Sequence, residues 1–182
     1  MGEPGRMNAA RLRLAFWLAV IALAGCAAKA PLPSQPPTLD LPFQLHVQRQ
    51  AEGQTQDWLL VIQGEGAALR WSLLDPLGIP LSRQRLLDGG WQNDGLLPPN
   101  PEARELFAAL LFALTPADQL VRQYPQAHTQ GNQRLFDHRQ PAWRVDYRLP
   151  QDRLPQERLP LNFDLRIGTR LTYRVDTLEA TP

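Results

Sequence analysis

The chain has 182 residues, of which 19 are basic and 18 acidic, so its formal net charge is +1, and it contains one cysteine. A nearly neutral chain of this length suits one domain with a single core and argues against a nucleic-acid partner. One cysteine excludes a fold held together by intramolecular disulfides.

The first 25 residues have the pattern of a secretory signal peptide. Arg6, Arg11 and Arg13 precede an apolar run from Leu14 to Gly25. This run is shorter than the roughly 20 residues that span a bilayer, and small residues follow it. We therefore expect residues 1–25 to be a cleaved leader, with a retained transmembrane anchor as the alternative.

The stretch IALAGCAAKA, residues 21–30, places Cys26 at the end of this leader. Leu23-Ala24-Gly25-Cys26 resembles a bacterial lipobox, in which cleavage precedes a cysteine that carries a diacylglyceryl thioether and an N-acyl group. The resemblance implies that Cys26 carries lipid and is not a nucleophile. Two or more acyl chains on one residue would anchor the protein stably in a membrane. The resemblance also bears on sorting: released lipoproteins usually lack aspartate just after the cysteine, and Ala27 stands there, which favours the periplasmic face of the outer membrane.

Residues 26–42 consist of Cys26 followed by AAKAPLPSQPPTLDLP at 27–42, a stretch rich in proline. Proline removes backbone donors and disfavours helix. We expect an extended, flexible tether that holds the domain off the membrane.

Residues 43–180 are expected to form one domain that begins with strands. Alternating or dense apolar patterns predict strands over 43–48, 57–63, 67–74 and 79–87, and a short strand around Trp91. The DPLG sequence at 75–78 has the chemistry of a tight turn between two of them.

Two helices are expected next. Asn100-Pro101 provides a capping side chain and then proline in the first turn, and apolar residues from Ala103 to Leu114 follow at helical spacing. Thr115-Pro116-Ala117-Asp118 repeats this capping pattern, so we expect it to start a short second helix.

The remainder returns to strands, predicted over 133–138, 143–147, 161–167 and 171–175, with 149–160 as an exposed loop. One apolar and one polar face per strand is typical of antiparallel sheet. The order of strands, helices and strands predicts a mainly β, α+β domain, in which a curved antiparallel sheet forms an unclosed half-barrel and the helices cover its apolar concave face.

Catalytic patterns are missing from the sequence. His46, His128 and His138 lie far apart without metal-ligand spacing, and no nucleophile elbow, P-loop or dinucleotide fingerprint is present. We expect no metal, no cofactor and no enzymatic activity. A hydrolase whose polar residues assemble only in space is the remaining enzymatic alternative.

The apolar residues of the strands and of the first helix suggest two alternatives. They either fill an ordinary core or line a cavity between sheet and helix that admits an acyl chain or another apolar ligand. The candidate lining residues are Trp58, Leu60, Trp71, Leu73, Phe107, Leu110, Leu111, Leu114, Trp143, Val145, Phe163 and Leu165.

Four stretches together resemble the LolA/LolB superfamily, and its LolB branch in particular. They are WSLLDPLGIPLSRQRL, NPEARELFAALLFALTPADQL, RLFDHRQPAWRVDYR and LPLNFDLRIGTRLTYRVDTLE, which occur in the family's order and cover most of residues 57–179. The resemblance implies an unclosed antiparallel barrel with a helical lid and an apolar cavity for acyl chains. It also implies an outer-membrane lipoprotein that receives lipoproteins from a periplasmic LolA-like carrier.

The same resemblance assigns a role to Leu77, which occupies the turn position where LolB members carry a protruding leucine that helps insert lipoproteins into the membrane. A leucine folded back on its own hairpin is the alternative. The chain is also similar to uncharacterised proteobacterial lipoproteins often encoded near aryl-polyene genes, which adds a polyene lipid to the expected cargo. We expect a monomer that is attached to the membrane by its lipid, with a non-catalytic scaffold for an envelope protein as the second hypothesis.

Overall fold

The structure, a computed structural model, describes residues 30–33, 35–137, 140–148 and 162–178. Its frame is one ten-stranded sheet in which every neighbouring pair is antiparallel. The strands are β1 (Phe43–Ala51), β2 (Gln54–Glu65), β3 (Ala68–Leu74), β4 (Pro80–Leu87), β5 (Gly90–Asn93), β6 (His128–Gln130), β7 (Gln133–Phe136), β8 (Trp143–Tyr147), β9 (Phe163–Ile167) and β10 (Leu171–Thr177).

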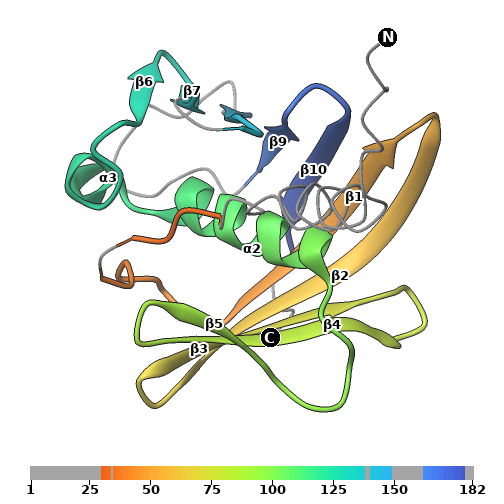
Figure 1. Cartoon of the computed structure of the whole chain (residues 1–182). Coiled ribbons are helices and arrows are strands. Elements are labelled where there is room, and N and C mark those ends of the chain that lie inside the picture. Colours follow the sequence, from red (N-terminus) through yellow and green to blue (C-terminus); the bar gives the residue numbers. More distant parts are fainter. Residues whose placement is uncertain (1–29, 34, 138–139, 149–161, 179–182) are drawn as a thin grey trace, which may run out of the picture.

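The strand order is β5-β4-β3-β2-β1-β10-β9-β8-β7-β6, so β5 and β6 are the two edges and the sheet does not close. Each half follows the chain from neighbour to neighbour, and the pairing of β1 with β10 joins the halves. At that junction Val47 is opposite Trp58 on β2 and opposite Val175 on β10. The sheet curves around the first described helix, which confirms the predicted unclosed half-barrel with a helical lid (Figure 1).

The lid is α2 (Pro101–Leu114), and α3 (Ala117–Gln123) follows it directly. α2 begins as the sequence predicts: the Asn100 side chain accepts a hydrogen bond from the backbone N of Ala103 at 3.0 Å, and Pro101 occupies the first turn. Within the described ranges, neither helix has the length and apolar character needed to cross a bilayer.

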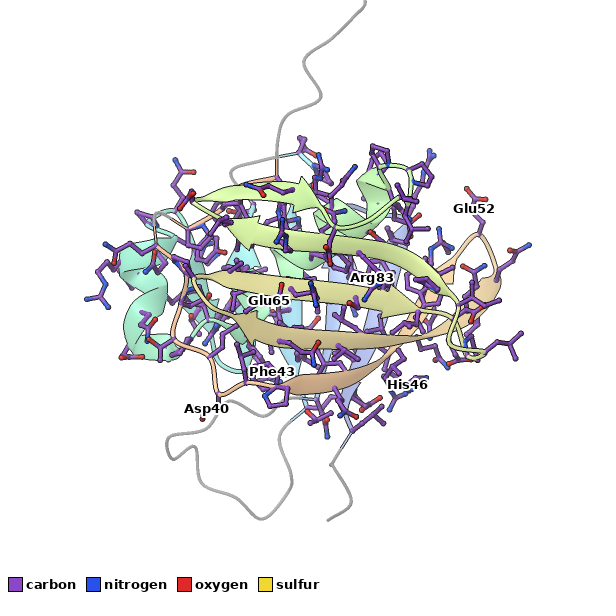
Figure 2. All side chains as sticks on the ribbon, turned by 90° about the horizontal axis from the view of Figure 1, so that it is seen from below. Asp40, Phe43, His46, Glu52, Glu65 and Arg83 are labelled. Carbon is purple, nitrogen blue, oxygen red and sulfur yellow. The ribbon has the colours of Figure 1, made fainter. Side chains whose placement is uncertain are left out.

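Alternation along the strands separates the two faces of the sheet. On β1, Leu45 and Val47 are fully buried toward α2, whereas the neighbouring Gln44 is exposed. Figure 2 shows the opposite face of β1–β5, from which the side chains of Glu65 and Arg83 project. The core therefore lies between the sheet and α2, as one-sided alternation predicts.

The helix α2 is buried more completely than its sequence pattern suggests. All nine residues from Leu106 to Leu114 are buried, including Ala108 and Ala109, which lie beside the predicted apolar face. A helix that is apolar on all sides is usually enclosed on all sides. The periodicity of the sequence predicted burial of only one face of α2.

Two local predictions differ from the structure. β6 was not predicted because its three residues are all exposed and polar, so that only pairing with β7 makes them a strand. Thr115 does not cap α3, which has no side-chain cap; its Oγ1 donates instead to the Leu111 carbonyl oxygen at 2.7 Å. Carbonyl groups at the end of α2 lack helical partners, and the hydroxyl satisfies one of them. The predicted loop at 149–160 lies outside the described residues.

Candidate functional site

The predicted leader 1–25 and the proposed lipidation residue Cys26 lie outside the described residues. The description begins at Ala30, inside the proline-rich segment.

The described part of that segment, residues 30–33 and 35–42, is called the strap below because it lies against the domain. It has no helix or strand, as its prolines predict, but Pro33 and Pro37 are buried. Leu32, Leu39 and Leu41 pack against the core. In Figure 1 the strap is the red to orange stretch that passes α2 and α3 before entering β1. This part of the expected tether is therefore docked and is not a free spacer.

Two glutamines of α3 hold the strap by its backbone. The backbone N of Gln35 donates to Gln123 Oε1 at 3.3 Å, and the backbone N of Thr38 donates to Gln119 Oε1 at 3.2 Å. Proline has no backbone N–H group, so the strap has few backbone donors. Two of these donors form the hydrogen bonds to α3.

The structure brings the twelve candidate cavity residues together between sheet and lid. Eleven are buried, and Trp58 is half-buried at their border. Among them, Phe107 of α2 lies 5.3 Å from Trp71 of β3, measured between ring centroids, and Phe107 also lies 5.8 Å from Trp91 of β5. None of the twelve residues lines either of the two open pockets described below.

An aromatic cluster occupies the part of this core below β7 and β8. Phe112 lies between Tyr124, Phe136 and Trp143, with ring-centroid distances of 5.1, 5.8 and 5.8 Å. Tilted and edge-to-face contacts of this kind add about 0.5–1.5 kcal/mol each beyond their buried area. The cluster therefore holds the C-terminal half of α2 on the sheet.

The first turn of α2 is tied to the sheet by Glu102. Its carboxylate accepts hydrogen bonds from the Arg49 guanidinium on β1, one of them at 3.1 Å, and from the Tyr173 hydroxyl on β10 at 2.9 Å. Burial alone would raise the pKa of Glu102, but the hydrogen bonds from Arg49 and Tyr173 outweigh it and lower that pKa. Burial and the neighbouring carboxylate raise the pKa of Tyr173. One turn later, Glu105 Oε1 accepts from Trp143 Nε1 at 2.7 Å.

The last turn of α2 is tied to the sheet by Arg134 on β7. Its guanidinium is buried and donates to the carbonyl oxygens of Phe112, Ala113 and Thr115. Tyr147 adds a hydroxyl bond to the Ala113 carbonyl at 2.6 Å and a ring face 5.2 Å from the guanidinium carbon. Burial lowers the pKa of Arg134. A cation at a helix C-terminus offsets the negative end of the helix dipole, so Arg134 acts as a buried cap.

A shallow pocket lies where the strap meets α3 and β7. It has a volume of about 290 Å³ and is open to solvent. Its lining residues are Pro31, Leu32, Gln123, Tyr124, Pro125, Gln126 and Phe136. A second open pocket, of about 320 Å³, lies at the β1–β2 turn and is lined mostly by polar residues.

The turn between β3 and β4 holds Leu77 away from the domain. Asp75 Oδ1 accepts hydrogen bonds from the backbone N of Leu77 at 2.9 Å and of Ile79 at 2.8 Å, and the Asp75 backbone bonds to both Gly78 and Ile79. Gly78 has a φ of 80°, a conformation that favours glycine. The Leu77 side chain is 84% exposed. It protrudes from an ordered turn and does not fold back on the hairpin.

Besides Leu178, which follows β10, three further large apolar side chains are exposed among the described residues. Ile79 follows Leu77 in the same turn, Leu96 is fully exposed in the loop between β5 and α2, and Val121 is 73% exposed on α3. Sequence reasoning missed Leu96. The signal that could have found it is a leucine pair placed between Gly95 and two prolines, where neither helix nor strand provides a buried face.

The histidines do not converge. His46 Nε2 lies 2.9 Å from Asp57 Oδ1 on the outer face, and His128 lies 4.0 Å from Asp137 at the far edge, while His138 is outside the described ranges. In the part of the chain that the structure describes, no group of three or more His, Cys, Asp or Glu could hold a metal ion.

Comparison with known proteins yields one family. No curated protein matches the sequence. A family model described as "Protein of unknown function (DUF3261)" matches residues 43–170, which begin with β1 and extend to the turn before β10. This range covers well over half of the chain, and the chain therefore belongs to the DUF3261 family.

Proposed function

We propose that this protein is an outer-membrane lipoprotein, anchored through Cys26, that accepts an apolar chain and passes it into the membrane. The cargo that carries this apolar chain is an acyl-type lipid, a polyene lipid or a lipoprotein. The observation that carries the proposal is the ordered turn that holds Leu77 in solvent. Exposing a large apolar side chain on a rigid turn serves no core, and such residues commonly contact a membrane or a partner.

The fold supports the proposal. An unclosed antiparallel half-barrel whose apolar face is covered by one helix is the arrangement expected for the LolA/LolB superfamily, and we propose that the chain is a distant member. A periplasmic LolA-like carrier would then be the partner that delivers the cargo, and the lipoprotein itself would act as a monomer.

Because α2 and the sheet belong to one buried cluster and Phe107 contacts Trp71, cargo that takes the place of α2 on the sheet has to displace it. Six large apolar side chains of α2 are buried, and returning each to water costs about 1.5–3 kcal/mol. An acyl chain with about 15 methylene groups gains roughly 12 kcal/mol on leaving water, at ~0.8 kcal/mol per group. The two quantities are similar, so a chain that takes the place of α2 on the sheet can offset most of the cost of moving it. The structure is then the closed, empty state.

Substitution of Leu77 tests the proposal. The full-length lipoprotein would be reconstituted with vesicles, and transfer of a fluorescently labelled acyl lipid into them would be followed. We expect Leu77→Glu to reduce transfer roughly tenfold or more, since it removes one leucine's burial and adds a charge. Val121→Glu is the matched control, because Val121 is a comparably exposed apolar residue on α3. Unchanged transfer by Leu77→Glu rules out the insertion role.

A second function has its own supporting observation. Because the apolar residues of sheet and lid are buried in one cluster, a non-catalytic scaffold that binds an envelope protein without ever opening is the second candidate. Fixing α2 to β1 by a short bismaleimide between cysteines introduced at Arg49 and Glu102 separates the two functions. A carrier loses uptake of a fluorescent fatty acid when α2 is fixed, whereas a scaffold takes up none in either state and keeps its protein partner.

A further inference from the structure

The loop between β5 and α2, residues 94–100, presents a second apolar tip. Leu96 is fully exposed there, and the loop is stiffened by two prolines and by Gly95, whose φ is 93°. No intramolecular role explains this exposure, since Leu97 beside it already turns toward the domain and is half-buried.

This loop lies at the same end of the sheet as the Leu77 turn. The Asp94 backbone N donates to the Arg83 carbonyl at 3.0 Å, so the loop leaves the sheet beside the first half of β4. β4 itself begins directly after Ile79. Both connections can be followed in Figure 1 at the end of the sheet where α2 starts.

Two arginines lie beside the point where the loop leaves β5. Arg83 projects from the outer face of β4 and is exposed (Figure 2). Arg104 approaches from the lid side, where its guanidinium donates to the side-chain oxygens of Gln84 at 3.2 Å and Asn93 at 3.3 Å. No carboxylate among the described residues pairs with either arginine, and Asp94 between them is already paired with Arg70 at 2.9 Å.

We propose that the 94–100 loop and the 75–79 turn together form a bilayer-docking edge, in which Leu96 inserts beside Leu77 and Ile79 while Arg83 and Arg104 bind the phosphates of anionic phospholipids. This inference rests on the proposed membrane role of Leu77 and extends it to a second loop and to a lipid class.

The spacing along β4 fits a membrane surface. Arg83 lies four residues from Ile79, which is roughly 13 Å of strand. Interfacial apolar groups enter about 5–10 Å past the headgroup boundary, so Arg83 would then lie near the phosphates. Arginine matches phosphate oxygens with paired donors.

The apolar side chains also fit a lipid surface better than a protein. Leu77 and Ile79 are on one turn and Leu96 is on another, so they form separate tips and not one continuous apolar patch. Stable protein interfaces need a larger packed surface with an apolar centre. Separate tips flanked by cations are typical of peripheral membrane binding.

The test uses the full-length lipoprotein in vesicles of phosphatidylethanolamine and phosphatidylglycerol. Single cysteines at Leu77, Leu96 or Val121 are labelled with an environment-sensitive fluorophore, and the parent chain, labelled in the same way, gives the background from Cys26. We expect a blue shift at positions 77 and 96 and none at 121. Arg83→Gln and Arg104→Gln should each weaken insertion of the position-96 probe about fivefold, the factor expected for one basic side chain near an anionic surface.

Arg144→Gln is the matched control, since Arg144 is an exposed arginine on β8. Arg83→Gln removes no side-chain hydrogen bond or ion pair within the described residues, and Arg104→Lys keeps the charge if Arg104→Gln disturbs α2. A blue shift of the probe at position 77 without one at position 96 overturns the membrane contact of the 94–100 loop and leaves the proposed function standing. No shift at either position overturns the membrane role of Leu77 as well. If the position-96 probe inserts equally well in the parent and in the Arg83 and Arg104 variants, the proposed phosphate contacts are overturned.

Discussion

Glu102 on the first turn of α2 accepts two hydrogen bonds from the guanidinium of Arg49, which lies 53 residues earlier on the central strand β1. Tyr173 on β10 bonds to the same carboxylate. The contact therefore ties the start of the lid to the two strands that join the halves of the sheet.

Glu102→Gln is expected to destabilise the domain in a pH-dependent way. The folded state lowers the pKa of Glu102 below its unfolded value near 4.3, so its stabilisation is present above that pH and is lost as the pH falls through the folded pKa. We expect the variant to lose about 1 kcal/mol at pH 7, since the side chain is partly exposed, and to approach the parent near pH 3.

Urea unfolding at pH 7 and pH 3 measures this difference. Glu52→Gln, which removes an exposed carboxylate from the β1–β2 turn, is the matched control for the loss of one negative charge. A stability gap between Glu102→Gln and the parent that does not shrink on acidification would contradict the assigned pairing.

Arg134→Met is expected to cost about 3 kcal/mol of unfolding free energy. It leaves the carbonyl oxygens of Phe112, Ala113 and Thr115 without their donor in a buried place, and removes the cation from the end of α2. Thermal or urea unfolding followed by circular dichroism measures it. The exposed Arg144→Met should change the same quantity by less than about 0.5 kcal/mol, and equal effects of the two substitutions would show that Arg134 is not a cap.

Phe107→Ala is expected to destabilise the domain by about 3–5 kcal/mol, because it opens a cavity between Trp71 and Trp91. The same cavity should bind a small apolar molecule such as benzene, which raises the melting temperature of the variant and leaves the parent unchanged. Calorimetry with and without the ligand measures both effects. A parent that gains as much from benzene would already contain an empty cavity.

Asp75→Ala tests whether the order of the turn contributes to its function. The substitution removes the acceptor for the backbone N of both Leu77 and Ile79 but leaves the apolar side chains in place. We expect a loss of about 1 kcal/mol in stability and a faster amide exchange of these two residues. Acyl-lipid transfer should fall less than in Leu77→Glu. Transfer as low as that of Leu77→Glu would mean that the position of the leucine matters as much as its apolar character.

The sequence predicted the architecture well where one residue's chemistry decides the local structure. Asn100 and Pro101 start α2 where their capping roles require, and alternation placed Leu45 and Val47 in the core. Both signals are local, since they depend on spacing along a single element. The turn around Leu77 follows from the same kind of signal, because its residues have strong conformational preferences. Whether Leu77 protrudes from that turn or folds back on the hairpin was left open by the sequence, and the structure shows it exposed.

Contacts between distant segments could not be predicted. The partners of Arg134 are carbonyl groups on another element, and an arginine in a strand pattern gives no sign of burial. Docking of the strap is a similar case: proline content correctly predicts the absence of helix and strand, but not whether Pro33 and Pro37 find a surface to pack against. Whether the apolar residues enclose a void depends on side-chain volumes in three dimensions, which composition does not determine.

The place of β10 has a consequence for the order in which the chain can fold. The last strand among the described residues, Leu171–Thr177, lies in the middle of the sheet between β1 and β9, although each half on either side is built from consecutive strands. Until it is available, β1 and β9 both have an unpaired edge, and such edges recruit strands from other molecules. Residues 171–177 must therefore be synthesised before the two halves can join, and a chain cut before residue 171 would be left with two unpaired, association-prone strand edges in the middle of the sheet.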